Sequence, residues 1–154
     1  MLKFKKMLLL TVGLMAAAVS AEEIAVPMLW QNAAAGQFQV SAMGFQCDAD
    51  RIIFAVKLNG LEEMLKKPRF LMGLYSNTDG DKATGRTFEG GQTGWDLQVN
   101  VNMAQRSLNA VQWEERKSLG LGLYLDDYLV ETVGEVVYVV IRREPLERFV
   151  FADV

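Results

Sequence analysis

The feature that most constrains this chain is a series of short segments in which apolar and polar residues alternate, separated by turn residues. One strand candidate runs from Arg51 to Leu58, where Ile52, Phe54, Val56 and Leu58 lie at every second position and share one face. Alternation with a period of two is typical of a β-strand with one buried face. Asp48-Ala49-Asp50, just before this segment, predicts the turn of a hairpin. Seven or eight such segments, with no long amphipathic helix, predict an antiparallel β-sandwich of jelly-roll or immunoglobulin-like type with about seven to nine strands.

Several other segments carry strand or turn signals. The further strand candidates are residues 38–47, 95–101, 107–113, 119–130 and 135–142. In the first of these the alternation slips by one residue beside Gly44, which predicts a β-bulge there. Residues 69–76 are strongly apolar and predict a central strand buried on both faces. Residues 61–67 precede Pro68 and predict a helical turn, while residues 145–154 predict a helical turn with a closing strand.

The first 21 residues have the layout of a secretory signal peptide. Lys3, Lys5 and Lys6 precede an apolar run of 13 residues, and small residues follow up to Ala21. That run is shorter than the roughly 20 apolar residues that a membrane-spanning helix needs. We therefore expect an exported protein, periplasmic or secreted, with a single domain over residues 22–154 that is not embedded in a membrane.

Composition excludes several classes of function. The chain has no histidine, which excludes Ser-His-Asp and Cys-His catalysis, histidine-ligated zinc and haem bound through a proximal histidine. Cys47 is the only cysteine, so an internal disulfide is impossible, and we predict that it is a small core residue. Residues 22–154 hold 13 basic and 19 acidic residues, a formal charge of −6, so nucleic acid is not an expected partner. The methionines outside residues 1–21 lie in apolar runs and are interpreted as core residues, so no haem is expected.

A long polar stretch with five glycines extends from residue 77 to residue 94. Asn77, Asp79 and Asp81 place side-chain oxygens at alternate positions, and Asp96 follows at the start of the next strand candidate. Calcium is bound by six to eight oxygens in proteins, so these four residues are candidate ligands of a calcium ion. The alternative is an ordinary turn rich in Asn, Asp and Gly between two strands, and the sequence leaves both interpretations open.

Three short motifs follow one another through this region of the chain. They are Leu74-Tyr75-Ser76-Asn77-Thr78-Asp79, then Thr84-Gly85, then Gly94-Trp95-Asp96. Together with the hairpin at residues 48–56 and the apolar run with its exit at residues 136–146, they resemble the family 9 carbohydrate-binding-module-like domains, which are related to the DOMON group. The resemblance spans roughly Phe38 to Leu146. It implies a β-sandwich of a secreted bacterial protein and a role in binding carbohydrate.

Carbohydrate binding by such modules depends on aromatic rings that stack on sugar rings. The candidate ligand-binding residues are Tyr75, Trp95, Trp113, Tyr124 and Tyr128. Trp95 and Trp113 lie in alternating segments beside apolar residues, so packing in the core is the alternative for both. Tyr124 and Tyr128 flank two aspartates in a predicted loop or sheet edge and are the other candidates for an exposed position.

The sequence does not indicate an enzyme. Glycoside hydrolysis requires two carboxylates at a defined separation, and nothing in the spacing of the aspartates sets one. The leading prediction is a non-catalytic module that binds a polysaccharide or oligosaccharide, with a calcium ion bracing the loop. The alternative is an envelope or extracellular interaction module that docks a protein partner through an edge strand.

Overall fold

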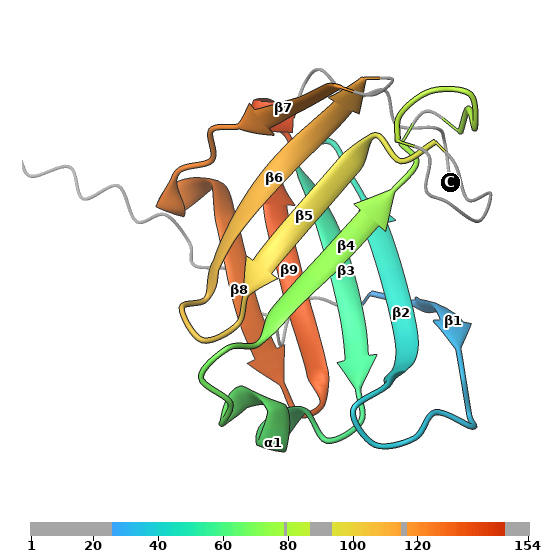
Figure 1. The fold of residues 1–154 in the computed structure, drawn as a ribbon, viewed down its shortest axis with the longest axis vertical. Helices are drawn as coiled ribbons and strands as arrows, with labels where there is room; N and C mark the ends of the chain where they lie inside the picture. The colour runs from blue at the N-terminus through green and yellow to red at the C-terminus, as the bar shows by residue number, and fades with distance from the viewer. Residues whose placement is uncertain (1–25, 79, 87–93, 115–116, 147–154) are drawn as a thin grey trace, which may run out of the picture.

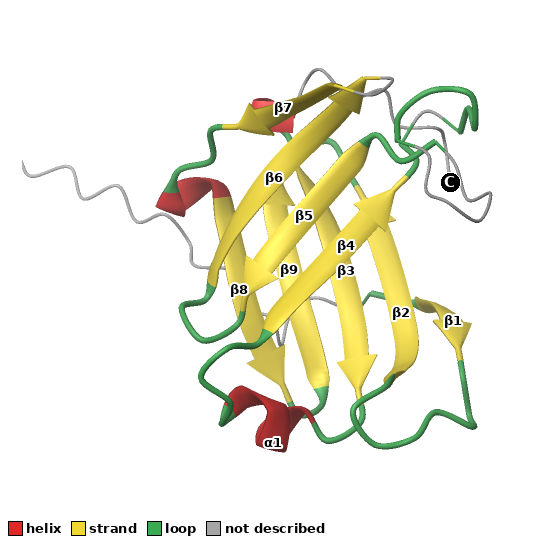
Figure 2. Ribbon diagram, in the orientation of Figure 1, coloured by secondary structure: helices red, strands yellow, loops and turns green. Residues whose placement is uncertain are grey.

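The computed structural model describes residues 26–78, 80–86, 94–114 and 117–146. These residues form nine strands in two antiparallel sheets (Figures 1 and 2), which confirms the predicted all-β sandwich. The five-stranded sheet has the order β1-β2-β3-β9-β8, with the bounds Met28–Gln31, Val40–Cys47, Arg51–Leu58, Val136–Arg142 and Tyr128–Val133. The four-stranded sheet has the order β4-β5-β6-β7, with the bounds Leu71–Ser76, Leu97–Asn102, Ser107–Glu114 and Lys117–Leu121.

Helical structure is limited to short pieces within the described residues. The α-helix α1 spans Leu61–Leu65 and confirms the helical turn predicted before Pro68. The 3-10 helices η2, Leu125–Asp127, and η3, Glu144–Leu146, each span three residues. No helix in the described part of the chain has the length and apolar character needed to cross a membrane.

The β2–β3 hairpin forms where it was predicted, and its turn has a clear local cause. The Asp48 side chain accepts hydrogen bonds from the backbone N–H groups of Asp50 and Arg51, each at 2.9 Å. The Arg51 side chain donates to the same carboxylate at 3.0 Å. An aspartate that binds N–H groups two and three residues later holds the chain in a tight turn, which sets the register of the two strands.

The irregularity predicted beside Gly44 is found in the pairing of β2 with β1, where Met28 pairs with Gly44 and Trp30 with Met43, so that the register shifts between Met28 and Trp30. The pairing of β2 with β3 shifts between Val40 and Ala42, whereas Gly44 pairs in regular register with Ala55. Gly44 serves another purpose, because a Cβ atom at this position would lie 2.6 Å from the carbonyl oxygen of Pro27. The glycine therefore permits the close approach of the segment that leads into β1.

The hydrophobic core fills the space between the two sheets. Alternate residues of β3 and β9 face it from the five-stranded sheet, and alternate residues of β5 face it from the other sheet. The fully buried members from these strands are Ile52, Val56, Val137, Val139, Ile141, Leu97, Val99 and Val101. In β5 the alternation that predicted the strand from sequence is thus the alternation between the core and the outer face.

Three sequence interpretations change when the strands are placed in their sheets. Among the described residues, residues 71–76 form the edge strand β4, which pairs only with β5, and not a central strand buried on both faces, since Leu71 is 72% exposed. Residues 119–130 are divided between β7 and β8, with the helix η2 between them. Strand β1 was not predicted. The proposed signal peptide over residues 1–21 lies outside the described residues, as does most of the segment 145–154, which was predicted to form a helical turn and a closing strand or tail.

Candidate functional site

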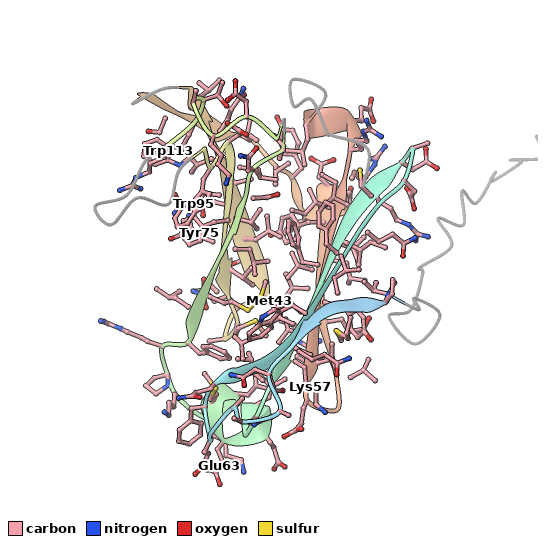
Figure 3. All side chains as sticks on the ribbon, turned by 90° about the vertical axis from the view of Figure 1, so that its right-hand side faces the viewer. Met43, Lys57, Glu63, Tyr75, Trp95 and Trp113 are labelled. Atoms are coloured by element: carbon pink, nitrogen blue, oxygen red, sulfur yellow. The ribbon has the colours of Figure 1, made fainter. Side chains whose placement is uncertain are left out.

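Three of the candidate aromatic residues lie together on the outer face of the four-stranded sheet (Figure 3). Tyr75 is in β4, Trp95 lies just before β5, and Trp113 is in β6. The ring centroids of Tyr75 and Trp95 are 4.6 Å apart, with an angle of 34° between the ring planes. Tyr75 is 42% exposed, and both tryptophans are half-buried. We call these three side chains the aromatic platform; none of them belongs to the core between the sheets.

The position of Trp95 departs from the pattern predicted by the sequence. The alternation placed Trp95 with Leu97 on the apolar face and Asp96 with Gln98 on the polar face. In the structure the regular alternation begins at Leu97, while Trp95 pairs with Arg86 in an isolated bridge and its ring contacts Tyr75. Trp95 and Asp96 have therefore exchanged the faces expected of them.

Asp96 is buried because its carboxylate organises the loop. Only 7% of the residue is exposed. One carboxylate oxygen accepts hydrogen bonds from the backbone N–H of Thr78 at 3.0 Å and from the Thr78 hydroxyl at 3.4 Å. The other accepts the Thr84 hydroxyl at 3.4 Å. These bonds offset the free-energy cost of removing the carboxylate from water. They also connect Thr78 and Thr84 to Asp96, the residue that follows Trp95.

Trp113 is held by polar neighbours on the same outer face. Its indole N–H donates to Oε1 of Gln98 at 3.1 Å, and Nε2 of Gln98 donates to Oδ1 of Asn100 at 2.8 Å. The guanidinium carbon of Arg86 lies 4.5 Å from the centroid of the Trp113 ring, which is cation–π geometry. Stacking and hydrogen bonding together hold the tryptophan in one orientation.

The other two aromatic candidates lie elsewhere in the fold. Tyr124 precedes η2 and is 80% exposed, and its backbone N–H donates to Oδ2 of Asp127 at 2.8 Å. Tyr128 begins β8 of the five-stranded sheet, and its side chain packs against the core. Among the described residues neither tyrosine contacts the aromatic platform, so the structure brings together three of the five candidates.

The oxygens predicted to bind calcium are engaged by the loop itself. Oδ1 of Asn77 accepts the N–H of Gly80 at 2.7 Å, and Oδ1 of Asp81 accepts the N–H of Ala83 at 2.8 Å. Asp96 binds the loop as described above, and Asp79 lies outside the described residues. Within the described part of the chain, no three acidic or cysteine side chains converge on a point where they could hold a metal ion. These side-chain oxygens accept hydrogen bonds within the turn, and the calcium ion stays a prediction from the sequence.

Three residues beside the platform, Gln98, Asn100 and Arg86, were not among the candidate site residues predicted from the sequence. Gln98 and Asn100 occupy the polar positions of an alternating strand, so the same periodicity that predicted β5 also placed them on the outer face. The contact of Gln98 with Trp113 was not predictable, because it joins side chains of two strands whose pairing register only the fold defines. Arg86 lies in the loop, and no periodic pattern indicated its stacking on Trp113.

Comparisons with known proteins gave no match, so the interpretation of this site rests on its geometry and on the sequence motifs. No protein-family model, no curated protein and no solved structure matched the chain. The resemblance to family 9 carbohydrate-binding-module-like and DOMON-like domains therefore stays a prediction from the sequence motifs.

Proposed function

We propose that this chain is a non-catalytic carbohydrate-binding module that acts after export, in a periplasm or outside the cell. The observation that carries the proposal is the aromatic platform, in which Tyr75, Trp95 and Trp113 lie on one outer face of the sandwich beside amide side chains. The export part of the proposal rests on the sequence of residues 1–21.

The chemistry of this face suits a sugar ring. A pyranose offers apolar C–H groups on its faces and hydroxyl groups around its rim. Moving the C–H groups from water onto an aromatic ring costs little desolvation free energy, whereas the hydroxyl groups need hydrogen-bonding partners. The stacked Tyr75 and Trp95 supply the first kind of contact, and Gln98 and Asn100 lie where they supply the second.

Calcium is not required for this proposal. The hydrogen bonds of Asn77, Asp81 and Asp96 already connect the loop to itself and to the sheet. The predicted calcium ion is therefore tested separately, by repeating each binding measurement in the presence of a chelator. Binding that is lost in chelator assigns a role to calcium, and binding that persists shows that the loop supports the platform without it.

The test compares platform variants with a matched variant elsewhere on the surface. Isothermal titration of the purified protein against a panel of soluble polysaccharides and oligosaccharides identifies a binder. Trp95→Ala and Tyr75→Ala are expected to weaken that binding at least tenfold, because each removes a stacking surface. Tyr124→Ala removes an aromatic ring that is 80% exposed and away from the platform, and it is expected to leave the affinity unchanged.

Two results would contradict the proposal. One is a folded wild-type protein that binds no member of the panel. The other is a Trp95→Ala variant that folds normally and binds as well as Tyr124→Ala does. Circular dichroism of each variant verifies that a loss of affinity is not a loss of structure.

One observation favours the alternative of a protein-interaction module. Strand β1 is an edge strand that pairs only with β2 among the described residues, and Leu29 and Trp30 on it are 61% and 49% exposed. An exposed apolar edge strand is a surface on which another chain can add a strand. For a second copy of this chain as the partner, light scattering is expected to show self-association that Trp30→Glu abolishes. A monomeric wild-type protein at high concentration excludes that partner.

A further inference from the structure

The strands of the four-stranded sheet carry no Asp, Glu, Lys or Arg side chain on their outer face, within the described residues, although these four residue types make up 23% of the chain. Its polar side chains are amides and hydroxyls from β5, β6 and β7, which alternate with the buried residues: Gln98, Asn100, Asn102, Ser107, Asn109 and Ser118. The outer face of the five-stranded sheet differs, since it includes Lys57 and Glu131. The face that holds the aromatic platform is therefore the neutral one.

The direction of each hydrogen bond on this face follows from Trp113. An indole N–H can only donate, so the Gln98 group that faces it must be the amide oxygen. The Gln98 amide nitrogen then faces Asn100 and donates to its oxygen Oδ1. The oxygen of Asn100 is thereby engaged, and its nitrogen Nδ2, with two N–H donors, has no partner among the described residues.

Asn100 is placed to present those donors to a ligand on the platform. It occupies β5 on the same face as Gln98, and its cross-strand neighbour in β4 is Gly73, which has no side chain to cover it. The ring of Tyr75 lies over Gly73, because a Cβ atom there would be 3.0 Å from Cε2 of Tyr75. The amide of Asn100 thus borders the aromatic surface on which a sugar would stack.

We propose that the ligand of the aromatic platform is a neutral polysaccharide and that Asn100 donates its Nδ2 hydrogens to the oxygens of that polysaccharide. This inference rests on the proposed carbohydrate-binding function and specifies the class of ligand. An anionic polysaccharide would require cationic side chains, and among the described residues the one that contacts the platform is Arg86, whose guanidinium group stacks on Trp113. The formal charge of −3 for the whole chain also disfavours a polyanion.

The experiment uses the purified protein, two groups of probes and one variant with a matched control. The neutral probes are hydroxyethyl cellulose, xyloglucan and galactomannan, and the anionic probes are polygalacturonate and alginate. Asn100→Asp keeps the oxygen that accepts from Gln98 and replaces the N–H donors with a second oxygen. Gln46→Glu makes the same change from amide to carboxylate on β2 of the other sheet, where no hydrogen bond of the side chain is lost.

We expect the wild-type protein to bind at least one neutral probe and to bind the anionic probes at least tenfold more weakly. Asn100→Asp is expected to weaken binding of the neutral probe about tenfold, the factor that corresponds to the loss of one hydrogen bond. Gln46→Glu is expected to bind as the wild type does. Asn100→Thr, which suits an exposed strand position and removes the donors without adding charge, gives a second measurement if Asn100→Asp does not fold.

Each contrary result overturns a different statement. Tighter binding of polygalacturonate or alginate than of the neutral probes overturns the neutral ligand and leaves the platform function standing. Unchanged affinity in folded Asn100→Asp, or an equal loss in Gln46→Glu, overturns the role of Asn100. A folded wild-type protein that binds no probe overturns this inference and the proposed function together.

Discussion

Gly85 is the position at which one added methyl group should do most damage to the loop that supports the platform. The residue is buried and has a φ of +66°, in the left-handed region. A Cβ atom at this position would lie 2.5 Å from Oδ1 of Asp96, 2.5 Å from the carbonyl oxygen of Trp95 and 2.6 Å from the carbonyl carbon of Trp95. Two of these three atoms are backbone, so Gly85→Ala requires the bridge between Arg86 and Trp95 to move.

The magnitude follows from two contributions. Holding an alanine in the left-handed region costs about 1–2 kcal/mol relative to a right-handed conformation. Forcing a methyl group into an occupied site costs typically about 1–3 kcal/mol more. Gly134→Ala separates the two contributions, because Gly134 has a φ of +57° and a Cβ atom there meets nothing within 4 Å. We therefore expect Gly85→Ala to lower the free energy of unfolding by about 1–3 kcal/mol more than Gly134→Ala does.

Urea denaturation of the two variants and the wild type, monitored by tryptophan fluorescence, measures this difference. The comparison is valid where the dependence of the unfolding free energy on urea concentration is the same in all three proteins. Equal stabilities for Gly85→Ala and Gly134→Ala would refute the reasoning, since they would show that the loop accommodates the methyl group without cost. If the effect is confined to the loop, a glycan binder found for the wild type should also bind Gly85→Ala more weakly.

Three further predictions concern the rest of the fold. Burial alone raises the pKa of Asp48, but hydrogen bonds from the backbone and side chain of the turn outweigh it and lower the pKa below its ordinary value. Because the folded pKa is lowered, the carboxylate stabilises the fold above about pH 4 and that stabilisation is lost as the pH falls through the folded pKa. In unfolding measured against pH, Asp48→Asn should thus be less stable than the wild type by at most about 1 kcal/mol at pH 7, with the difference shrinking in acid. Burial raises the pKa of the Cys47 thiol, so a thiol reagent at pH 8 should label the native protein at least tenfold more slowly than the protein in urea, and equal rates would exclude a protected thiol. Leu97→Ala, at a fully buried position, should lower the free energy of unfolding by about 2–5 kcal/mol, whereas Leu29→Ala, at a position 61% exposed, should change it by less than about 0.5 kcal/mol.

Local patterns in the sequence were sufficient for several strands of this protein, although β1 was not predicted and residues 119–130 were not divided between β7 and β8. Residues 51–58 place Ile52, Phe54, Val56 and Leu58 at every second position and form β3 over the same residues, since the face of a strand that packs on a core requires that period. Asp48 marks the turn before it through bonds to its near neighbours in the chain. Predictions of this kind depend on contacts between residues a few positions apart, and such contacts are visible in a single sequence.

The arrangement of the candidate site depended on strand order and on long-range hydrogen bonds, which no local pattern in the sequence indicates. The apolar residues 69–76 predicted a central strand, but the order of strands in the finished sheet decides whether a strand lies at the edge or in the centre. Trp95 and Asp96 exchanged their predicted faces because hydrogen bonds from residues 78 and 84 hold the carboxylate inside.

The sequence by itself determined that the chain alternates as the strands of a β-sandwich, and it also named the aromatic residues of the platform. Only the tertiary structure decided that Tyr75, Trp95 and Trp113 share one outer face, whereas Tyr128 packs on the core. The physical reason is that the face of a residue within a strand is a local property, whereas its neighbours across strands depend on sheet order and register. Those contacts join residues far apart in the chain, such as Trp113 with Gln98 and Arg86.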